Sequence, residues 1–194
     1  MTAAPRDAVR YATAAPSDRP AILALNQANV PHVGPLDAAK LARLHAEAAS
    51  LRVARVGDEI VGFVLAMIEK ADYESPNFRW FVERYPRFTY VDRIAVADEW
   101  RGRGIGRGLY EAVEAMIRTG AIDDRRRSAQ RAPDWLTCEV NLVPPNPGSM
   151  SFHERLGFAG VGERWDEVGG TGVRMMAKAV RSSPHRHGDP SARQ

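Results

Sequence analysis

Runs of apolar residues along the chain predict most of its strands. The longest run, Glu59–Ile68, is apolar almost throughout its centre, which is typical of a strand covered on both faces. A second strand, 51–56, precedes it across Gly57-Asp58, a pair that favours a compact hairpin turn. Further strands are predicted over 8–14, Phe88–Val96, Trp135–Val143, 157–167 and 171–180, where β-branched and aromatic residues lie between turn residues.

Apolar residues at helical spacing alternate with these strands. Ser17 is a predicted N-cap for a first helix, and Asp37 is a predicted N-cap for a second one. The most regular stripe indicates a helix that starts at Gly104, and it consists of Ile105, Leu109, Val113, Met116 and Ile117. Shorter helices are predicted over 77–84 and 148–156. The order of elements predicts an α/β fold, with a mixed, mostly antiparallel central sheet flanked by helices on both faces.

Composition indicates one folded domain with a tail. The chain has 194 residues, of which 44% are hydrophobic, and this suits a single domain over residues 1–180. Residues 181–194 are polar and rich in Pro, Ser and His, so we expect a disordered C-terminal tail there. The net charge of +3 does not require a nucleic-acid partner. The basic stretch 125–131 is interpreted as a solvated loop or helix end, with a nucleic-acid or acidic partner as the alternative.

Cysteine usage and hydropathy exclude several classes of protein. Cys138 is the single cysteine, so an intrachain disulfide and a zinc site of several cysteines are excluded. No apolar stretch approaches the about 18 residues of a membrane-spanning helix, and the N-terminus lacks the apolar centre of a signal peptide. We therefore expect a cytoplasmic protein with no metal site and no membrane partner.

The densest candidate site is the turn R-G-R-G-I-G-R-G, between the strand that ends at Val96 and the stripe-bearing helix. Glycines at 102, 104, 106 and 108 allow positive φ and a close approach of the backbone to a ligand. The free N–H groups at the start of a helix bind anions, and Arg101, Arg103 and Arg107 add positive charge. This combination predicts a ligand that contains a pyrophosphate.

Two familiar phosphate-binding motifs do not match this turn. A P-loop ends in Gly-Lys-Ser/Thr, which is absent. The dinucleotide motif G-x-G-x-x-G fails because its last glycine is replaced by Arg107 or Leu109, depending on the starting position. An Arg-Gly-rich RNA-binding segment would be disordered, whereas this turn has a firm strand before it and an amphipathic helix after it.

The pattern R-x-x-G-x-G, formed by Arg101, Gly104 and Gly106, resembles the coenzyme A motif of the GCN5-related N-acetyltransferase (GNAT) family. The flanking strand and helix lie where that family has them. Residues 146–158, N-P-G-S-M-S-F-H-E-R-L-G-F, are similar to the next block of the family, and the resemblance covers roughly residues 8–180. It implies the acyl-CoA N-acyltransferase fold, with acetyl-CoA as co-substrate and transfer of its acetyl group to a primary amine.

The resemblance also implies which residues bind the cofactor. In such enzymes the strand before the turn splays away from its neighbour and leaves backbone groups free for the pantetheine arm. Ile94 and Val96, with Ala95 between them, would supply these groups, and Asn146 and Ser149 would face the cofactor from the next strand–helix junction. The remaining cofactor-binding residues would lie in the turn, with backbone N–H groups on the pyrophosphate: Arg101, Gly102, Arg103, Gly104, Ile105, Gly106 and Arg107.

The implied reaction needs several chemical groups but no covalent enzyme intermediate, so Cys138 is not the expected nucleophile. A neutral amine attacks the thioester carbonyl, a base or a water chain ending at one removes its proton, and a backbone N–H near Ile94–Val96 stabilises the oxyanion. A donor should assist the departing thiolate. His153 is the candidate acid, at a place where the family commonly has Tyr.

Two acidic residues that interrupt apolar strands are the candidate bases. Asp92 lies two residues before Ile94 and is expected on the same face of the sheet, with the adjacent Arg93 pointing the opposite way. Glu139 interrupts the strand around Cys138. A carboxylate beside a desolvated pocket has a raised pKa, as a base requires.

The acceptor and the partners are less constrained. The first helices and the aromatic-rich stretch 70–87 are expected to shape the pocket for a small-molecule or peptide amine, with His32 at the same opening. Ordinary core packing is the alternative for those aromatics. A non-catalytic acyl-CoA-binding or regulatory module is the competing function, and nucleic-acid binding through 125–131 is a third hypothesis. Homodimers are common among such domains.

Overall fold

The computed structural model describes residues 8–122, 135–166 and 168–180. The predicted tail 181–194 and the basic stretch 125–131 lie outside these residues. Seven strands form a single sheet in the order β1-β2-β3-β4-β5-β7-β6. The strands are β1 (Arg10–Thr13), β2 (Ser50–Val56), β3 (Glu59–Ile68), β4 (Phe88–Val96), β5 (Trp135–Val143), β6 (Ala159–Asp166) and β7 (Thr171–Ala179).

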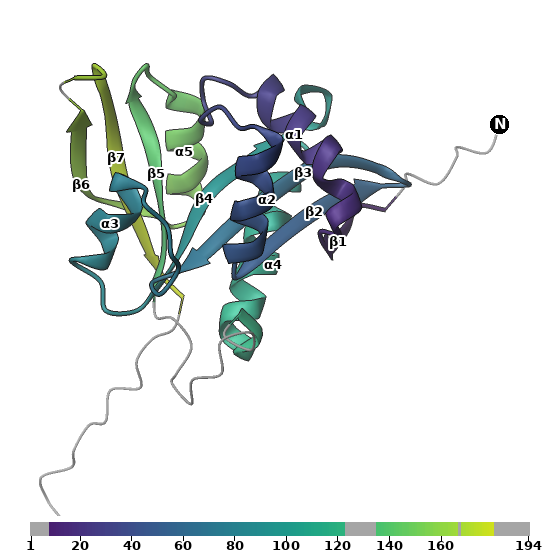
Figure 1. The fold of residues 1–194 in the computed structure, drawn as a ribbon, viewed down its shortest axis with the longest axis horizontal. Helices are drawn as coiled ribbons and strands as arrows, with labels where there is room; N and C mark the ends of the chain where they lie inside the picture. The colour runs from purple at the N-terminus through teal and green to yellow at the C-terminus, as the bar shows by residue number, and fades with distance from the viewer. Residues whose placement is uncertain (1–7, 123–134, 167, 181–194) are drawn as a thin grey trace, which may run out of the picture.

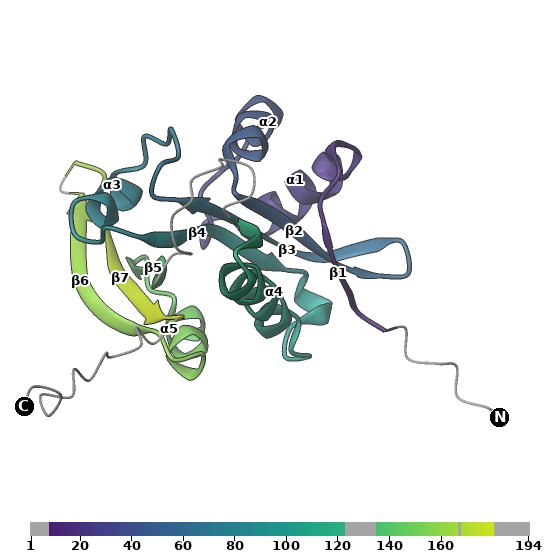
Figure 2. The same ribbon diagram turned by 90° about the horizontal axis from the view of Figure 1, so that it is seen from below.

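Helices cover both faces of this sheet (Figures 1 and 2). One face carries α1 (Arg19–Ala28), α2 (Ala38–Glu47) and α3 (Pro76–Val82). The other face carries α4 (Ile105–Thr119) and α5 (Pro147–Arg155). Two short 3-10 turns, η1 (Pro16–Asp18) and η2 (Asp98–Trp100), precede α1 and follow β4. The predicted fold class is confirmed.

Each face of the sheet has its own hydrophobic core. Ile22, Leu41 and Phe81 pack on one side, and Ile105, Leu109 and Val113 on the other. Strand β3 contributes to both, because Phe63 and Leu65 belong to the first core while Val64 and Ala66 belong to the second. The continuous apolar run of β3 therefore belongs to a strand that is covered on both faces, as predicted.

The helix caps agree with the sequence in one case and differ in the other. Asp37 caps α2 by accepting a 2.6 Å hydrogen bond from the Lys40 backbone N–H, as predicted. The prediction that Ser17 caps the first helix is wrong. The N-cap position of α1 is held by Asp18, whose carboxylate makes no cap bond to this helix but accepts from the Ala15 N–H and is held by Arg55 of β2.

The pairing of β4 with β5 is short. These two strands are parallel and pair at Phe88–Trp135, Thr89–Leu136 and Tyr90–Thr137, while every other neighbouring pair in the described sheet is antiparallel. Beyond Tyr90 the pairing ends although both strands continue. The expected splay beside the glycine-rich turn is thus confirmed, and it opens the centre of the sheet.

Gly108 lies on α4 against β1, and we predict that replacing it with Ala destabilises the fold. Helix propensity alone favours Ala over Gly by about 1 kcal/mol, but a Cβ here would overlap the ring of Tyr11. We expect Gly108→Ala to lower the free energy of unfolding by about 1–3 kcal/mol in urea titrations. In a Tyr11→Ala background the same change should be neutral or stabilising; equal effects in both backgrounds would contradict this packing account.

Candidate active site

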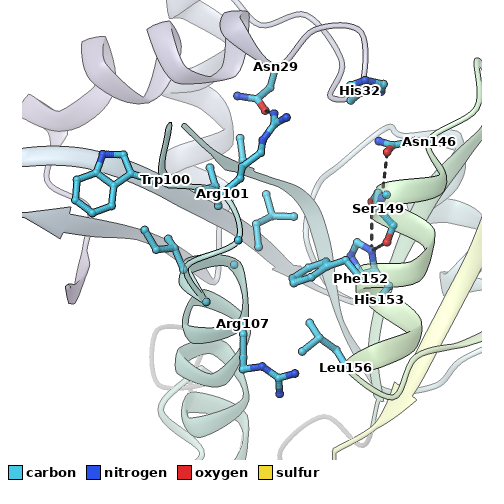
Figure 3. Close-up of a pocket in the computed structure, with 18 of the residues that line it drawn as sticks. Asn29, His32, Trp100, Arg101, Arg107, Asn146, Ser149, Phe152, His153 and Leu156 are labelled. Atoms are coloured by element: carbon cyan, nitrogen blue, oxygen red, sulfur yellow. Dashed lines mark hydrogen bonds between the residues drawn. The ribbon is translucent and has the colours of Figure 1, made fainter. Parts of the chain in front are cut away.

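A cavity of about 560 Å³ lies beside the end of β4, beyond the point where its pairing with β5 stops (Figure 3). Its walls come from both faces of the sheet. The end of β4, the glycine-rich turn with the start of α4, and one side of α5 along its length form three of them. The fourth is the connection between α1 and α2, which contributes Asn29, His32 and Val33. The cavity therefore connects the α4–α5 face with the α1–α2 face through the sheet.

The glycines of the turn serve two different purposes. Gly102 and Gly104 have φ values of 72° and 83°, in the left-handed region that disfavours other residues. Gly106 allows close packing instead, because a Cβ there would lie 3.0 Å from Cζ of Phe152. These three line the cavity, whereas Gly108 does not and packs against Tyr11. The fourth glycine is thus structural.

The three arginines of the turn also differ. Arg101 lines the cavity and donates a 2.7 Å hydrogen bond to Oδ1 of Asn29, which ties the turn to the end of α1. Arg107 lines the cavity on the first turn of α4. The guanidinium of Arg103 stacks 4.7 Å from the ring centroid of Trp100 and is outside the cavity lining.

The structure brings together all the predicted cofactor-binding residues except Arg103. Ile94, Ala95 and Val96 line the cavity from β4, and Asn146 and Ser149 line it from α5. Asn146 is also the N-cap of α5, where its Oδ1 accepts a 3.1 Å hydrogen bond from the Ser149 N–H. Contacts of these residues with a cofactor stay a prediction.

His153 lies in the cavity wall, but both of its ring nitrogens are engaged by the protein. Its Nδ1 is 2.8 Å from the backbone oxygen of Ser149, and its Nε2 is 2.7 Å from the hydroxyl of Tyr110. The residue is only 3% exposed. Burial lowers the pKa of His153, and this outweighs the hydrogen bond to Ser149, which acts in the opposite direction. Its predicted role as an acid stays a prediction.

Glu139 extends from β5 toward the α1–α3 face. Its carboxylate accepts a 2.6 Å hydrogen bond from Tyr90 and a 3.0 Å one from the side-chain amide of Asn77. Burial raises the pKa of Glu139 to about 7, and the negative charge of Asp92 acts in the same direction, while the two hydrogen bonds oppose the shift. A carboxyl group that titrates near neutral pH can accept a proton from an amine.

Asp92 departs from the expected geometry in two respects. It is the extra residue of a β-bulge, because Val91 pairs with Ala66 and Arg93 pairs with Leu65. The bulge breaks the alternation of side chains, so the prediction that Arg93 points away from Asp92 is wrong. The two form an ion pair with Nε and Oδ2 2.7 Å apart, and their side chains are 6% and 5% exposed.

The bulge also separates Asp92 from Ile94. Asp92 accepts a 2.5 Å hydrogen bond from Tyr73, which packs on the α1–α3 side, whereas Ile94 packs against the α4–α5 core. The expectation that Asp92 and Ile94 share a face is therefore wrong. Neither Asp92 nor Glu139 is among the residues that line the cavity.

Several polar residues of the site are not marked by any sequence motif. Tyr90 lies in an apolar strand and has the pattern of a core aromatic, yet its hydroxyl holds Glu139. Asn77 joins Glu139 to Arg164 of β6, whose Nε donates a 2.6 Å hydrogen bond to the Asn77 oxygen. The stretch 70–87 supplies Tyr73, which donates to Asp92, and Asn77, which donates to Glu139. The sequence indicated these residues only through the expectation that this stretch lies beside the site.

Comparison with known proteins agrees with this architecture. The family model described as "Acetyltransferase (GNAT) domain" matches residues 47–160, which is more than half of the chain. This chain therefore belongs to the GNAT acetyltransferase family, whose members are acyltransferases. No curated protein matches the sequence.

Solved structures share the fold at low sequence identity. Ard1 from Thermoplasma volcanium is 17% identical with a TM-score of 0.68, and the match covers 90% of this chain and 99% of that one. The ribosomal-protein-S18-alanine N-acetyltransferase from Escherichia coli is 15% identical with a TM-score of 0.64, covering 92% and 98%. Arabidopsis thaliana Naa50, in complex with the bisubstrate analogue CoA-Ac-MVNAL, is 16% identical with a TM-score of 0.63, covering 88% and 98%.

Two further observations concern the part of the chain that the structure describes. None of its helices is long and apolar enough to cross a membrane. It contains no group of three or more His, Cys, Asp or Glu side chains arranged to hold a metal ion.

The raised pKa of Glu139 predicts a dependence of stability on pH. The folded chain keeps this proton up to about pH 7, whereas the unfolded chain releases it near the ordinary value of 4.5. Stability should therefore fall as pH rises between these values, by on the order of 2–3 kcal/mol. The Glu139→Gln variant should lack this fall in melting curves recorded across that range, while Glu154→Gln, an exposed site on α5, should retain it. Parallel pH profiles for wild type and Glu139→Gln would contradict the assignment.

Proposed function

We propose that this protein transfers an acetyl group from acetyl-CoA to a primary amine. The observation that carries the proposal is the cavity beside the end of β4, which is lined from both faces of the sheet where β4 no longer pairs with β5. One end is lined by the turn and helix start suited to a pyrophosphate, and the other reaches the α1–α2 connection. A long cofactor can enter from one face and present its thioester to an amine that approaches from the other.

The cofactor contacts follow from the groups in the walls. The unpaired N–H groups at the start of α4, around Gly104 and Gly106, would bind the pyrophosphate. Backbone groups of β4 beyond Tyr90 no longer pair with β5, so those of Ile94 and Val96 are available to the pantetheine amides. Asn146 and Ser149 would contact the same arm from α5.

The reaction is a direct transfer. The amine nitrogen, as the free base, bonds to the thioester carbon, and the negative charge of the tetrahedral intermediate on oxygen is stabilised by a backbone N–H of β4. The carbon–sulfur bond then breaks, and sulfur leaves with the electron pair. Glu139 accepts the proton lost by the amine. Water must relay this proton, because the carboxylate of Glu139 does not line the cavity. Asp92, held as an ion pair by Arg93, raises the pKa of Glu139.

A peptide amine is the acceptor that we propose to test first. Naa50 was solved with an analogue that joins coenzyme A to a peptide, and the Escherichia coli protein is named for a ribosomal-protein alanine. In the present chain, the half-buried carboxylate of Glu139 extends toward the α1–α3 face, where it can accept a proton from such an amine. Peptides with free and blocked N-termini, together with small amines, form the acceptor panel.

A non-catalytic acyl-CoA-binding module is the second candidate. It is favoured by two observations: both nitrogens of His153 are occupied by protein groups, and Glu139 lies outside the cavity lining. Tight binding of coenzyme A without thiol release on any member of the acceptor panel would favour it. Turnover with any acceptor would exclude it.

Gly104→Val should weaken binding of coenzyme A at least about tenfold in isothermal titration calorimetry, because a side chain at the N-cap of α4 distorts the left-handed backbone that aims the N–H groups. Gly57→Val is the matched control. Gly57 also has a left-handed φ, 58°, and at both glycines the space that a Cβ would occupy is open, but Gly57 lies in the β2–β3 turn. Equal affinities for wild type and Gly104→Val would show that the turn does not hold the cofactor.

Glu139→Gln should reduce kcat/KM by about 10²- to 10⁴-fold with the best acceptor of the panel. In the wild type, kcat/KM should rise with pH through two limbs, one near pH 7 because the carboxylate must be ionised to accept a proton and one set by the acceptor amine, which must be the free base. The variant should retain only the pH limb of the acceptor amine. Stopped assays of thiol release across pH provide the measurement, with Glu154→Gln as the control; an unchanged profile in Glu139→Gln would rule out this base.

A further inference from the structure

The α5 wall of the cavity contains a chain of polar groups, of which the proposed function uses Asn146 and Ser149 only as contacts of the pantetheine arm and assigns no role to His153. Asn146, Ser149 and His153 are spaced by three and four residues and therefore share one face of the helix (Figure 3). The His153 ring makes edge contacts with the rings of Tyr110, Phe152 and Phe158. Because the ring is enclosed, its hydrogen bonds, and not solvent, decide where its proton resides.

The contacts of His153 define one tautomer. A backbone carbonyl oxygen can only accept, so the 2.8 Å contact with the Ser149 oxygen requires a hydrogen on Nδ1. The lowered pKa keeps the ring neutral, and Nε2 then has a lone pair. This lone pair accepts the hydroxyl hydrogen of Tyr110 at 2.7 Å. His153 consequently has no N–H left to offer to a ligand in the cavity.

The same tautomer determines the role of the Ser149 hydroxyl. Nδ1 also lies 3.3 Å from Oγ of Ser149, and because Nδ1 carries the hydrogen, Oγ is the acceptor in this contact. Within the described residues, Oγ of Ser149 has no other hydrogen-bond contact, so its own hydrogen has no protein acceptor. Ser149 lines the cavity and is partly exposed to it. Its hydrogen is thus available to a group inside the cavity.

We propose that the Ser149 hydroxyl donates a hydrogen bond to the sulfur of coenzyme A as the thiolate leaves, with His153 and Tyr110 as positioning residues. This inference rests on the proposed function. When the carbon–sulfur bond breaks, sulfur carries the electron pair, and the hydroxyl stabilises this charge without giving up its proton. The amine proton goes to Glu139, and solvent protonates the thiolate after release. Ser149 thereby takes the donor role that the sequence predicts for His153.

The test is the thiol pKa of bound coenzyme A, which needs no acceptor. Thiolate absorbance of the complex is titrated with pH and referenced to the complex with desulfo-coenzyme A, which lacks the thiol. Ser149→Ala should raise this pKa by about one to two units, the range of a hydrogen bond to a charged group. At alkaline pH it should weaken coenzyme A binding about tenfold or more, and it should weaken binding of desulfo-coenzyme A, which offers no thiolate to the hydroxyl, much less. Ser151→Ala, an exposed site on the same helix, should change neither quantity.

A second variant tests the positioning role. His153→Phe keeps a ring in the aromatic enclosure but removes the Nδ1 hydrogen that orients Ser149. It should raise the thiol pKa in the wild-type background and produce no further rise in the Ser149→Ala background, because the two residues act as one unit. A full rise caused by His153→Phe in the Ser149→Ala background would identify His153 as the direct donor and overturn the inference.

Failure of the two proposals gives different results. Wild-type protein that binds neither coenzyme A nor desulfo-coenzyme A would overturn the proposed function and this inference with it. Wild-type protein that binds both, with the same thiol pKa in Ser149→Ala, would overturn the role of Ser149 alone. Binding of desulfo-coenzyme A by Ser149→Ala shows that the variant is folded, so a change in its thiol pKa reports on the hydroxyl.

Discussion

The rest of the structure depends on the loss of pairing between β4 and β5. Two parallel strands that part after three residue pairs leave backbone donors and acceptors without partners in the middle of a sheet. Such groups need other hydrogen-bond partners. Here they face a cavity that also has the starts of α4 and α5 on its walls, so a ligand or solvent in the cavity can reach them. The opening therefore sets the position of the glycine-rich turn, the α5 face and the α1–α2 connection together.

Side-chain contacts between separate elements hold the walls of this opening in place. Phe152 of α5 fills the space left by Gly106 of α4, which sets the distance between the two helices. On the opposite face, Arg93 pairs with Asp92 and also donates to Asn26 and to the Gly34 carbonyl, so β4 is joined to α1 and to the connection after it. Arg101 adds a third link through Asn29. The cavity is held by contacts among separate elements rather than by a single core.

Sequence patterns predicted the elements correctly where neighbouring residues in the chain determine the structure. The bounds of β3, β4 and β5 follow directly from their apolar runs, and the glycine-rich turn follows from residue types that few other sites require. The family resemblance then located the splay. The failures lie where a distant partner matters: Arg55 of β2 holds the side chain of Asp18 at the start of α1, where Ser17 was expected to cap, and the register with β3 places the bulge at Asp92. The orientation of His153 depends on Tyr110, 43 residues away in the chain.

The connection of Glu139 to the outer elements has a consequence for how such a protein diversifies. Asn77 of α3 holds the carboxylate and is itself held by Arg164 of β6, while Trp80 of α3 covers Gly162 of the same strand. These contacts join α3 and β6 to Glu139, the proton acceptor that we propose. Exchanging α3 or β6 for the matching segment of a relative would therefore alter the ionisation of Glu139 along with the surroundings of the proposed acceptor site. In the proposed reaction, recognition and reactivity are not independent.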